Sequence, residues 1–420
     1  MQSPGEHRNW ISSVNLQAVT MALAIVAALT LGGAQTAPAQ TFTVIHTFTG
    51  GTDGAAPDAG LTLDAAGNLY GTASAGGNGF SGTVYKLTHR GTGWTFNPLY
   101  NFAGGNDGAS PIARVIFGPN GTLYGTTSDQ GMGQGVVGTV FNLRPPVSVC
   151  KTTLCPWGED VLYRFTGSGS DGFVPGYGDL VFDRSGNIYG TTIKGGTNGK
   201  GTVFELTPSG GGWTESILYN MTASSGIYPY NGVIFDQSGN LYGTTYEGGI
   251  MSTYGSIYEL TPSGSGWTQS TIYTLQEATG SYPYGGVIFD QAGNLYGTTS
   301  YNGPDEAGTV FELSPSNGGW KYNVIHSFAG SEGPYGGVTM DAAGNLYGTT
   351  FAGGANQHGS VYKLTPSGGG WTFTDLYDFT GGNDGQGPYG TVAIDANGNL
   401  YGTASHNGAL GYGTIWEIMP

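Results

Sequence analysis

The chain has 420 residues, of which 80 are glycine, and a formal net charge of −16 with only 12 lysines and arginines. Charged residues make up 10% and aromatic residues 13%, whereas disordered chains are rich in charge and poor in aromatic side chains. The glycines follow no three-residue period, which excludes collagen. Scattered cations also argue against nucleic acid or an anionic membrane surface as a partner.

Residues 1–39 have the pattern of a signal peptide. A polar start containing Arg8 precedes an apolar core at residues 19–31, which is shorter than the roughly 20 residues of a membrane span. Ala37-Pro38-Ala39 then forms an A-x-A-type cleavage site. We expect export and cleavage after Ala39, giving a secreted, periplasmic or surface protein with no membrane span. An uncleaved anchor is the alternative.

The rest of the chain, residues 40–420, is predicted to be one domain built from a repeat. The motif Gly-Asn-Leu-Tyr-Gly-Thr-Thr, or a close variant, returns about every 54 residues. It occurs seven times, with its tyrosines at Tyr70, Tyr124, Tyr189, Tyr242, Tyr296, Tyr347 and Tyr401. A long repeat of this kind indicates a solenoid or a propeller.

Each repeat contains four strand-like segments, which the fourth copy illustrates. An apolar run at residues 232–236 fits a strand covered on both faces. The motif strand at 240–245, an alternating strand at 255–260 and a fourth strand at 267–275 follow, separated by turns rich in glycine. In the fourth strand a tryptophan usually precedes a tyrosine by six residues, as in Trp267 and Tyr273, and we expect both in the core.

The two ends of the chain indicate a closed ring. Residues 41–48 match a fourth strand, as comparison with residues 324–328 shows, whereas the chain ends on a third strand at 413–418. Pairing these ends completes a seventh blade and removes an exposed sheet edge. The predicted fold is therefore all-β, a seven-bladed β-propeller of four-stranded blades, closed by the N-terminal strand. An open β-solenoid is the alternative.

Both cysteines, Cys150 and Cys155, lie in an insertion between the third and fourth strands of the second repeat. In an exported protein such a pair usually forms a disulfide, which here would close a small loop outside the core. Two free thiols are the alternative. No second pair of ligands follows at a spacing that suits zinc.

The stretch Pro-Tyr-Gly-Gly-Val-Ile-Phe-Asp-Gln-Ala-Gly-Asn-Leu-Tyr-Gly-Thr-Thr, at residues 283–299, resembles the bacterial choice-of-anchor tandem repeat family. It is more distantly similar to NHL-type propeller repeats. The resemblance covers residues 41–420 and implies export and surface association, but it implies no activity and no catalytic residues. Because the chain ends directly after its last strand, we expect a secreted or periplasmic product in preference to a tethered one.

Two charged side chains interrupt the repeat in the inner strand. Four residues before the aspartate that ends this strand, most repeats have glycine, but the second has Arg114 and the third has Asp179. These repeats are neighbours, so the two side chains are expected to meet near the channel. We favour a structural ion pair between blades, with a ligand-binding or catalytic pair as the alternative.

A set of tyrosines follows the prolines that begin the inner strands: Tyr230, Tyr284, Tyr335 and Tyr389. They are candidates for an aromatic rim that stacks on sugars or grips a peptide, although packing between blades is the favoured interpretation. Acidic residues in the loops before these strands suggest calcium only weakly, since a calcium site needs roughly six to eight oxygen ligands. They are Asp53, Asp107, Asp171, Glu332 and Asp384.

No metalloprotease or nucleophile-elbow motif occurs in the sequence. The regular repeat favours a non-catalytic binding or interaction module that holds a glycan, a peptide or a cell-surface partner at one channel mouth. A propeller hydrolase, lactonase or lyase acting on sugars or small esters is the alternative, and a structural surface-layer component is a third. We expect a monomer without a cofactor.

Overall fold

A computed structural model describes residues 40–91, 93–129, 137–146, 157–250, 253–264, 266–331 and 333–420. One compact unit runs from Phe42 to Met419. Apart from two single-turn 3-10 helices, η1 (Gly105–Asp107) and η2 (Glu277–Thr279), its described elements are antiparallel strands. The predicted signal peptide and both cysteines, Cys150 and Cys155, lie outside the described residues.

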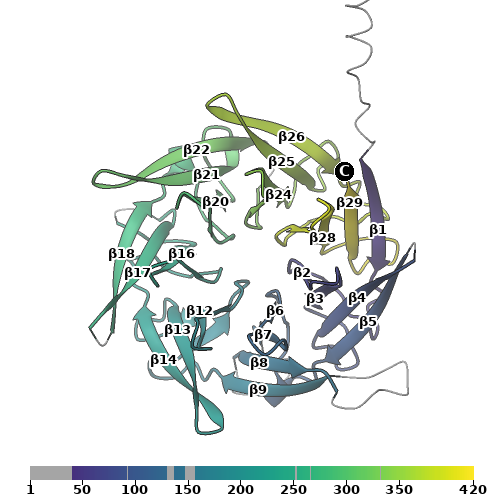
Figure 1. The fold of residues 1–420 in the computed structure, drawn as a ribbon, viewed down its shortest axis with the longest axis horizontal. Helices are drawn as coiled ribbons and strands as arrows, with labels where there is room; N and C mark the ends of the chain where they lie inside the picture. The colour runs from purple at the N-terminus through teal and green to yellow at the C-terminus, as the bar shows by residue number, and fades with distance from the viewer. Residues whose placement is uncertain are drawn as a thin grey trace, which may run out of the picture. The chain divides into compact units, whose positions relative to one another are not determined.

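The strands form seven sheets arranged as the blades of a ring (Figure 1). Blades 1 to 3 contain β2 (Thr62–Leu63), β3 (Leu69–Ala73), β4 (Thr83–Arg90) and β5 (Gly93–Asn101); β6 (Ile116–Phe117), β7 (Leu123–Thr127), β8 (Thr139–Arg144) and β9 (Gly158–Arg164); and β11 (Val181–Phe182), β12 (Ile188–Gly195), β13 (Thr202–Ser209) and β14 (Gly212–Asn220). An additional strand, β10 (Gly172–Pro175), pairs with the far end of β12.

Blades 4 to 6 repeat the same order. They contain β15 (Ile234–Phe235), β16 (Leu241–Thr245), β17 (Ser256–Ser263) and β18 (Gly266–Thr274); β19 (Ile288–Phe289), β20 (Leu295–Thr299), β21 (Glu306–Ser316) and β22 (Gly319–Ala329); and β23 (Thr339–Met340), β24 (Leu346–Thr350), β25 (Ser360–Ser367) and β26 (Gly370–Asp378). Blade 7 contains β27 (Ala393–Ile394), β28 (Leu400–Ala404), β29 (Thr414–Met419) and, on its outer edge, β1 (Thr41–Thr47). The predicted seven-bladed propeller and its closure are confirmed.

The inner strands form shorter ladders than the sequence predicts. In blade 4 only Ile234 and Phe235 pair with the motif strand. The residues before them approach the neighbouring blade instead: a Cβ atom on Gly178 of blade 3 would lie 1.7 Å from the nitrogen of Gly232 in blade 4. Only glycine permits so close a contact between two backbones. This half of the inner segment therefore packs between blades and does not extend the sheet.

The glycine of the repeat motif makes room for an aromatic ring. Gly402 in β28 lies opposite Trp416 in β29, and a Cβ atom on Gly402 would lie 2.2 Å from the indole. Gly243 and Tyr258 stand in the same relation in blade 4, with 2.5 Å to the phenolic oxygen. Both aromatic side chains are fully buried. The motif thus places one large ring at the centre of the blade, where aromatic side chains contribute most to packing.

In the described residues, a threonine of the motif bonds to the following blade at six of the seven junctions between blades. Its hydroxyl donates to a backbone carbonyl of the following blade over 2.8–3.3 Å. The pairs are Thr72 with Ala113, Thr191 with Asn231, Thr244 with Gly285, Thr298 with Gly336, Thr349 with Gly390 and Thr403 with Ala59. The last pair runs from blade 7 to blade 1 and so closes the ring.

The N-terminal strand contributes more than a sheet edge to this closure. After β1 pairs with β29, the backbone nitrogen of Phe48 donates to the carbonyl of Gly413 over 3.0 Å. The Phe48 ring is fully buried in a cluster that contains side chains of blade 1, such as Leu61, and of blade 7, such as Ile415. The strand and the residue after it therefore bind the two ends of the ring together.

Removal of residues 41–48 should destabilise the ring far more than removal of an ordinary tail, because it exposes β29 and empties the Phe48 site. Phe48→Ala alone should lower the free energy of unfolding by about 3–5 kcal/mol, the usual cost of truncating a buried phenylalanine. Urea denaturation measures both effects. Phe80→Ala is the matched control, since Phe80 is 83% exposed. Equal stability of the Phe48 and Phe80 variants would contradict this account of closure.

Candidate functional site

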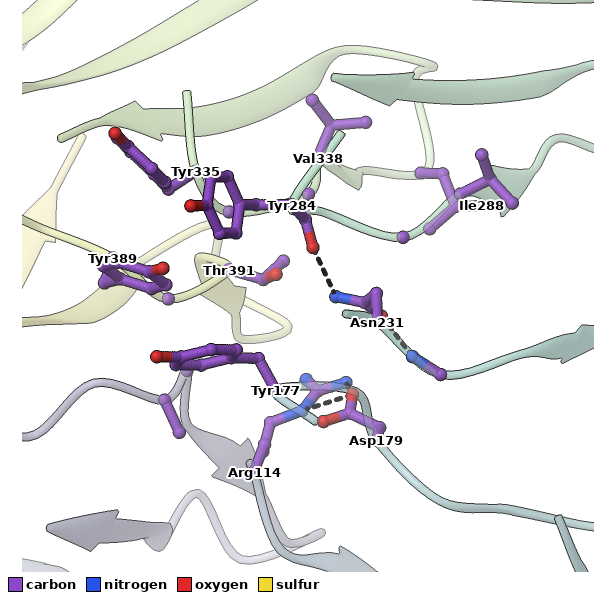
Figure 2. A pocket seen from close by; sticks show the side chains of 18 of the residues that line it. Arg114, Tyr177, Asp179, Asn231, Tyr284, Ile288, Tyr335, Val338, Tyr389 and Thr391 are labelled. Atoms are coloured by element: carbon purple, nitrogen blue, oxygen red, sulfur yellow. Dashed lines mark hydrogen bonds and ion pairs between the residues drawn. The ribbon is translucent and has the colours of Figure 1, made fainter. Parts of the chain in front are cut away.

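The inner segments of all seven blades enclose a cavity of about 160 Å³. Pockets for drug-sized ligands span roughly 300–1,000 Å³, so this one has room for a single ring or the end of a chain. Its wall includes residues of each blade, among them Asp58, Ile112, Tyr177, Asn231, Tyr284, Tyr335 and Tyr389. Figure 2 shows several of these side chains gathered around the space.

Five tyrosines at equivalent positions surround this mouth of the channel, and we call them the rim tyrosines. They are Tyr177, Tyr230, Tyr284, Tyr335 and Tyr389, each six residues before the aspartate that ends its inner strand. Their ring centroids lie 4.7 Å apart for Tyr284 and Tyr335, and 5.2 Å apart for Tyr335 and Tyr389. The structure thus brings together the four tyrosines that the sequence singles out.

Tyr177 is the rim tyrosine that the sequence does not single out. A search for Pro-Tyr pairs misses it because Gly176 stands between Pro175 and this tyrosine. Counting six residues back from Asp183 would have found it. Its ring lies 5.2 Å from that of Tyr389 and 6.2 Å from that of Tyr230, so it completes the rim across the channel.

A second group of tyrosines extends this aromatic surface outward, and we call them the outer tyrosines. Because neighbouring strands of a blade are antiparallel, the end of each motif strand lies at the same mouth as the start of the inner strand. The outer tyrosines lie at these strand ends and in the loops beside them: Tyr246, Tyr254, Tyr282 and Tyr301. Tyr246 links the two groups, with centroids 4.8 Å from Tyr284 and 4.9 Å from Tyr282. The cluster covers blades 4 and 5, and Phe351, 4.9 Å from Tyr335, continues it to blade 6.

Burial keeps three tyrosine hydroxyls of this surface protonated, so that they remain hydrogen-bond donors at neutral pH. Burial raises the pKa of Tyr246, Tyr335 and Tyr389 above the ordinary value for a phenol. The hydroxyls of Tyr301 and Tyr335 lie 2.6 Å apart and bond to each other. The mouth therefore offers flat apolar faces together with protonated hydroxyls, the combination that suits an amphipathic ligand.

Two blades carry a different residue at the rim position, Asp58 in blade 1 and Ile112 in blade 2. Asp58 accepts a hydrogen bond from the Ser74 hydroxyl over 2.7 Å. Burial raises the pKa of this carboxyl group, and the bond from Ser74 and the proximity of His406 offset the shift only in part. Sequence analysis misses Asp58 because it interrupts a tyrosine series and follows no acidic motif.

Arg114 and Asp179 meet as an ion pair in the wall of the cavity (Figure 2). The Nε atom of Arg114 donates to Asp179 Oδ2 over 2.9 Å, and a terminal nitrogen contacts the same oxygen. The pair joins blade 2 to blade 3. At this junction the motif hydroxyl, that of Thr126, is buried and has no partner among the described residues. The ion pair thus takes the place of the threonine bond found elsewhere in the ring.

The acidic loop residues mainly serve their own loops. Asp384 accepts from the backbone and hydroxyl of Thr380 and from Tyr377, and Asp53 accepts from Thr49 in the same way. Asp107 and Asp171 also bond to their own loops, whereas Glu332 lies outside the described residues. Where the structure describes side chains, no three His, Cys, Asp or Glu residues are grouped so as to hold a metal ion.

The ring of blades and its tyrosine-lined cavity define a repeat-built β-propeller with a candidate ligand site at one mouth. The family can be named from the sequence: the chain belongs to the Gloeobacter/Verrucomicrobia repeat family, whose model matches residues 34–159, 149–335 and 319–420. In the described part of the chain, no helix has the length and apolar character to cross a membrane.

Known proteins resemble parts of this chain. A xyloglucanase of Paenibacillus sp is 25% identical over 226 residues, which is 50% of this chain but only 20% of that protein. The extracellular domain of BT4673 from B. thetaiotaomicron has a TM-score of 0.52 at 12% identity, covering 89% of this chain and 39% of that one. PorZ, a bacterial surface component of the type-IX secretion system of Porphyromonas gingivalis, has a TM-score of 0.50 at 14% identity, covering 85% and 46%. These two structures share the fold.

Arg114→Gln should lower the free energy of unfolding by about 1.5–3 kcal/mol, the range for a hydrogen bond to a charged group, because it leaves Asp179 unpaired between blades. Chemical denaturation measures the loss. Arg144→Gln is the matched control: Arg144 pairs with Asp160 on the surface, where both side chains are about half exposed. Exposed pairs contribute little, so this variant should stay within about 1 kcal/mol. Equal losses of unfolding free energy in the two variants would contradict a structural role for the ion pair of Arg114 and Asp179.

Proposed function

We propose that this protein is an exported, non-catalytic module that binds glycans at the tyrosine-lined mouth of its channel. The observation that carries the proposal is the continuous aromatic surface of rim and outer tyrosines. A sugar ring has an apolar face that stacks on an aromatic ring and hydroxyl groups that bond at its edge. Half-buried tyrosines supply both kinds of contact and lose little entropy on binding.

The size of the cavity limits how such a ligand can bind. With about 160 Å³, the cavity takes one sugar unit or the end of a chain between the rim tyrosines. The outer tyrosines lie beyond it, in contact with the rim through Tyr246 and Tyr301. We therefore expect a terminal unit in the cavity and the following units against the outer tyrosines.

The similarity to a xyloglucanase supports a glycan in preference to a peptide or a surface protein. That enzyme's name concerns its own substrate, and this chain matches a fifth of its length. The export pattern of residues 1–39 and the resemblance to choice-of-anchor repeats support a site of action outside the cytoplasm. The extracellular domain of BT4673 and the surface component PorZ are consistent with that location.

The charges of the cavity favour binding over hydrolysis. Glycosidases generally use two carboxyl groups on either side of the scissile bond, one as an acid and one as a base or nucleophile. Asp58 and Asp179 both line the cavity, but Asp179 is held by Arg114. This arrangement leaves Asp58 without a second available carboxylate among the described lining residues. A sugar hydrolase is therefore the less favoured function.

Tyr284→Ala and Tyr335→Ala should each weaken glycan binding about tenfold or more, as expected for truncating an aromatic residue at the centre of a binding site. A glycan array with the chain from residue 40 identifies a ligand, with xyloglucan oligosaccharides as the first probe, and calorimetry then gives the affinities. Phe373→Ala is the matched control because Phe373 lies on the outer strand β26, is 37% exposed, and has ring contacts with His326, Phe328 and Tyr362, none of which is a rim or outer tyrosine.

Unchanged affinity in the folded Tyr284→Ala variant would place the ligand elsewhere. Release of reducing sugar ends from a bound glycan by the wild-type chain would replace the binding proposal with a hydrolase. The same protein and glycan samples serve for the binding measurement and for the assay of reducing ends, so the two outcomes can be compared directly.

A further inference from the structure

Asp58 is the one carboxylic acid at the rim position of the seven blades. It belongs to blade 1, which follows blade 7 in the ring, so that it continues the row of Tyr335 and Tyr389. Its carboxylate affects the pKa of Tyr177, which burial and this negative charge both raise. An acidic group thus stands among aromatic rings in the wall of a small cavity.

When Asp58 is ionised, the described residues that line the cavity carry a net negative charge. The described residues that line it include one cation, Arg114, and this side chain is neutralised by Asp179. Within the described residues Asp58 forms no salt bridge. Its contacts are with the neutral hydroxyls of Ser74 and Ser405, and the exposed His406 ring lies near enough to influence it. A carboxylate in this position is therefore available to an incoming cation.

Building on the proposed glycan-binding function, we infer that the cavity selects glycans with free amino groups, and that Asp58 accepts a hydrogen bond from the protonated amine. The rim tyrosines add to this preference because an ammonium group is attracted to the face of an aromatic ring. A charged hydrogen bond to the carboxylate is roughly twice as strong as a neutral one. A glycan of glucosamine units has this chemistry, and its N-acetylated form lacks it.

Acetylation is informative because it removes the charge and keeps the sugar. The neutral amide can still stack on the tyrosines, but it offers no cation to Asp58 or to the aromatic faces. The two glycans therefore share every contact of the proposed function and differ in the contact inferred here.

The experiment compares glucosamine and N-acetylglucosamine oligomers of equal length by calorimetry, at a pH low enough to protonate the amines and high enough to ionise Asp58, whose pKa burial raises. The wild-type chain should bind the glucosamine oligomer about tenfold more tightly. Asp58→Asn, which keeps the acceptor for Ser74, should abolish the difference by lowering the affinity for the glucosamine oligomer to that for the acetylated one. Circular dichroism and a thermal melt of the same preparation show whether the variant is folded.

Asp305→Asn is the matched control for overall charge, since Asp305 is exposed and lies outside the cavity. It should keep the full preference, because the chain retains its large negative charge. Equal affinity of the two oligomers for the wild-type chain, or a preference that survives Asp58→Asn, would overturn the inference. Oligolysine that binds as tightly as the glucosamine oligomer would overturn the assignment to a sugar.

Failure of this inference and failure of the proposed function give different results. If the inference alone is wrong, neutral glycans still bind and Tyr284→Ala still weakens them, but the amine makes no difference. If the proposed function is wrong, no glycan binds in a manner that depends on Tyr284.

Discussion

The hydrogen bond from a motif threonine to the next blade is the contact on which the rest of the ring depends. Blades of a propeller share no ladder, so they are joined by side-chain packing and by whatever polar bonds cross the junction. Here one residue of the repeat supplies such a bond at six junctions, including the closing one from Thr403 to Ala59, and backbone bonds such as that from Ser110 to Ser81 accompany it. Each such bond contributes about 1 kcal/mol, and the repeat multiplies it around the ring.

The same bond determines where the rim side chains lie. Its acceptor is always the residue directly after the rim position: Thr244 bonds to the carbonyl after Tyr284, and Thr298 to the carbonyl after Tyr335. A backbone held at this point fixes the direction of the preceding side chain. The surface at the channel mouth is thus positioned by the contact that assembles the blades, which is how a rigid scaffold presents a binding site.

Much of the fold could be predicted because the repeat is long and its ends are out of phase. The motif count gave seven blades, and the unpaired first segment predicted closure, since β1 has no partner other than β29. The short inner ladders could not be predicted, because an apolar run such as residues 232–236 does not reveal that the backbones of two blades touch at Gly178 and Gly232. That contact depends on how blades pack, which no local pattern records.

The site was predictable to the extent that it follows the repeat. Four rim tyrosines follow a Pro-Tyr pair and were found, whereas Tyr177 is displaced by Gly176 and was not. The outer tyrosines belong to different strands and loops, so only the antiparallel order of each blade brings them to the same mouth. Asp58 was missed for the opposite reason, because a single departure from a series has no pattern of its own.

A residue that differs from its equivalents in the other repeats indicates a function only where the fold does not already explain the difference. Arg114 and Asp179 are accounted for, because they replace a missing threonine bond at one junction. The rim position differs, since the carbonyl of the following residue makes the structural contact and leaves the rim side chain unconstrained by assembly. Ala59 accepts from Thr403 whether residue 58 is acidic or aromatic. An acidic side chain at this position, half-buried among tyrosines and desolvated at a cost, is therefore better explained by what enters the cavity than by what holds the ring together.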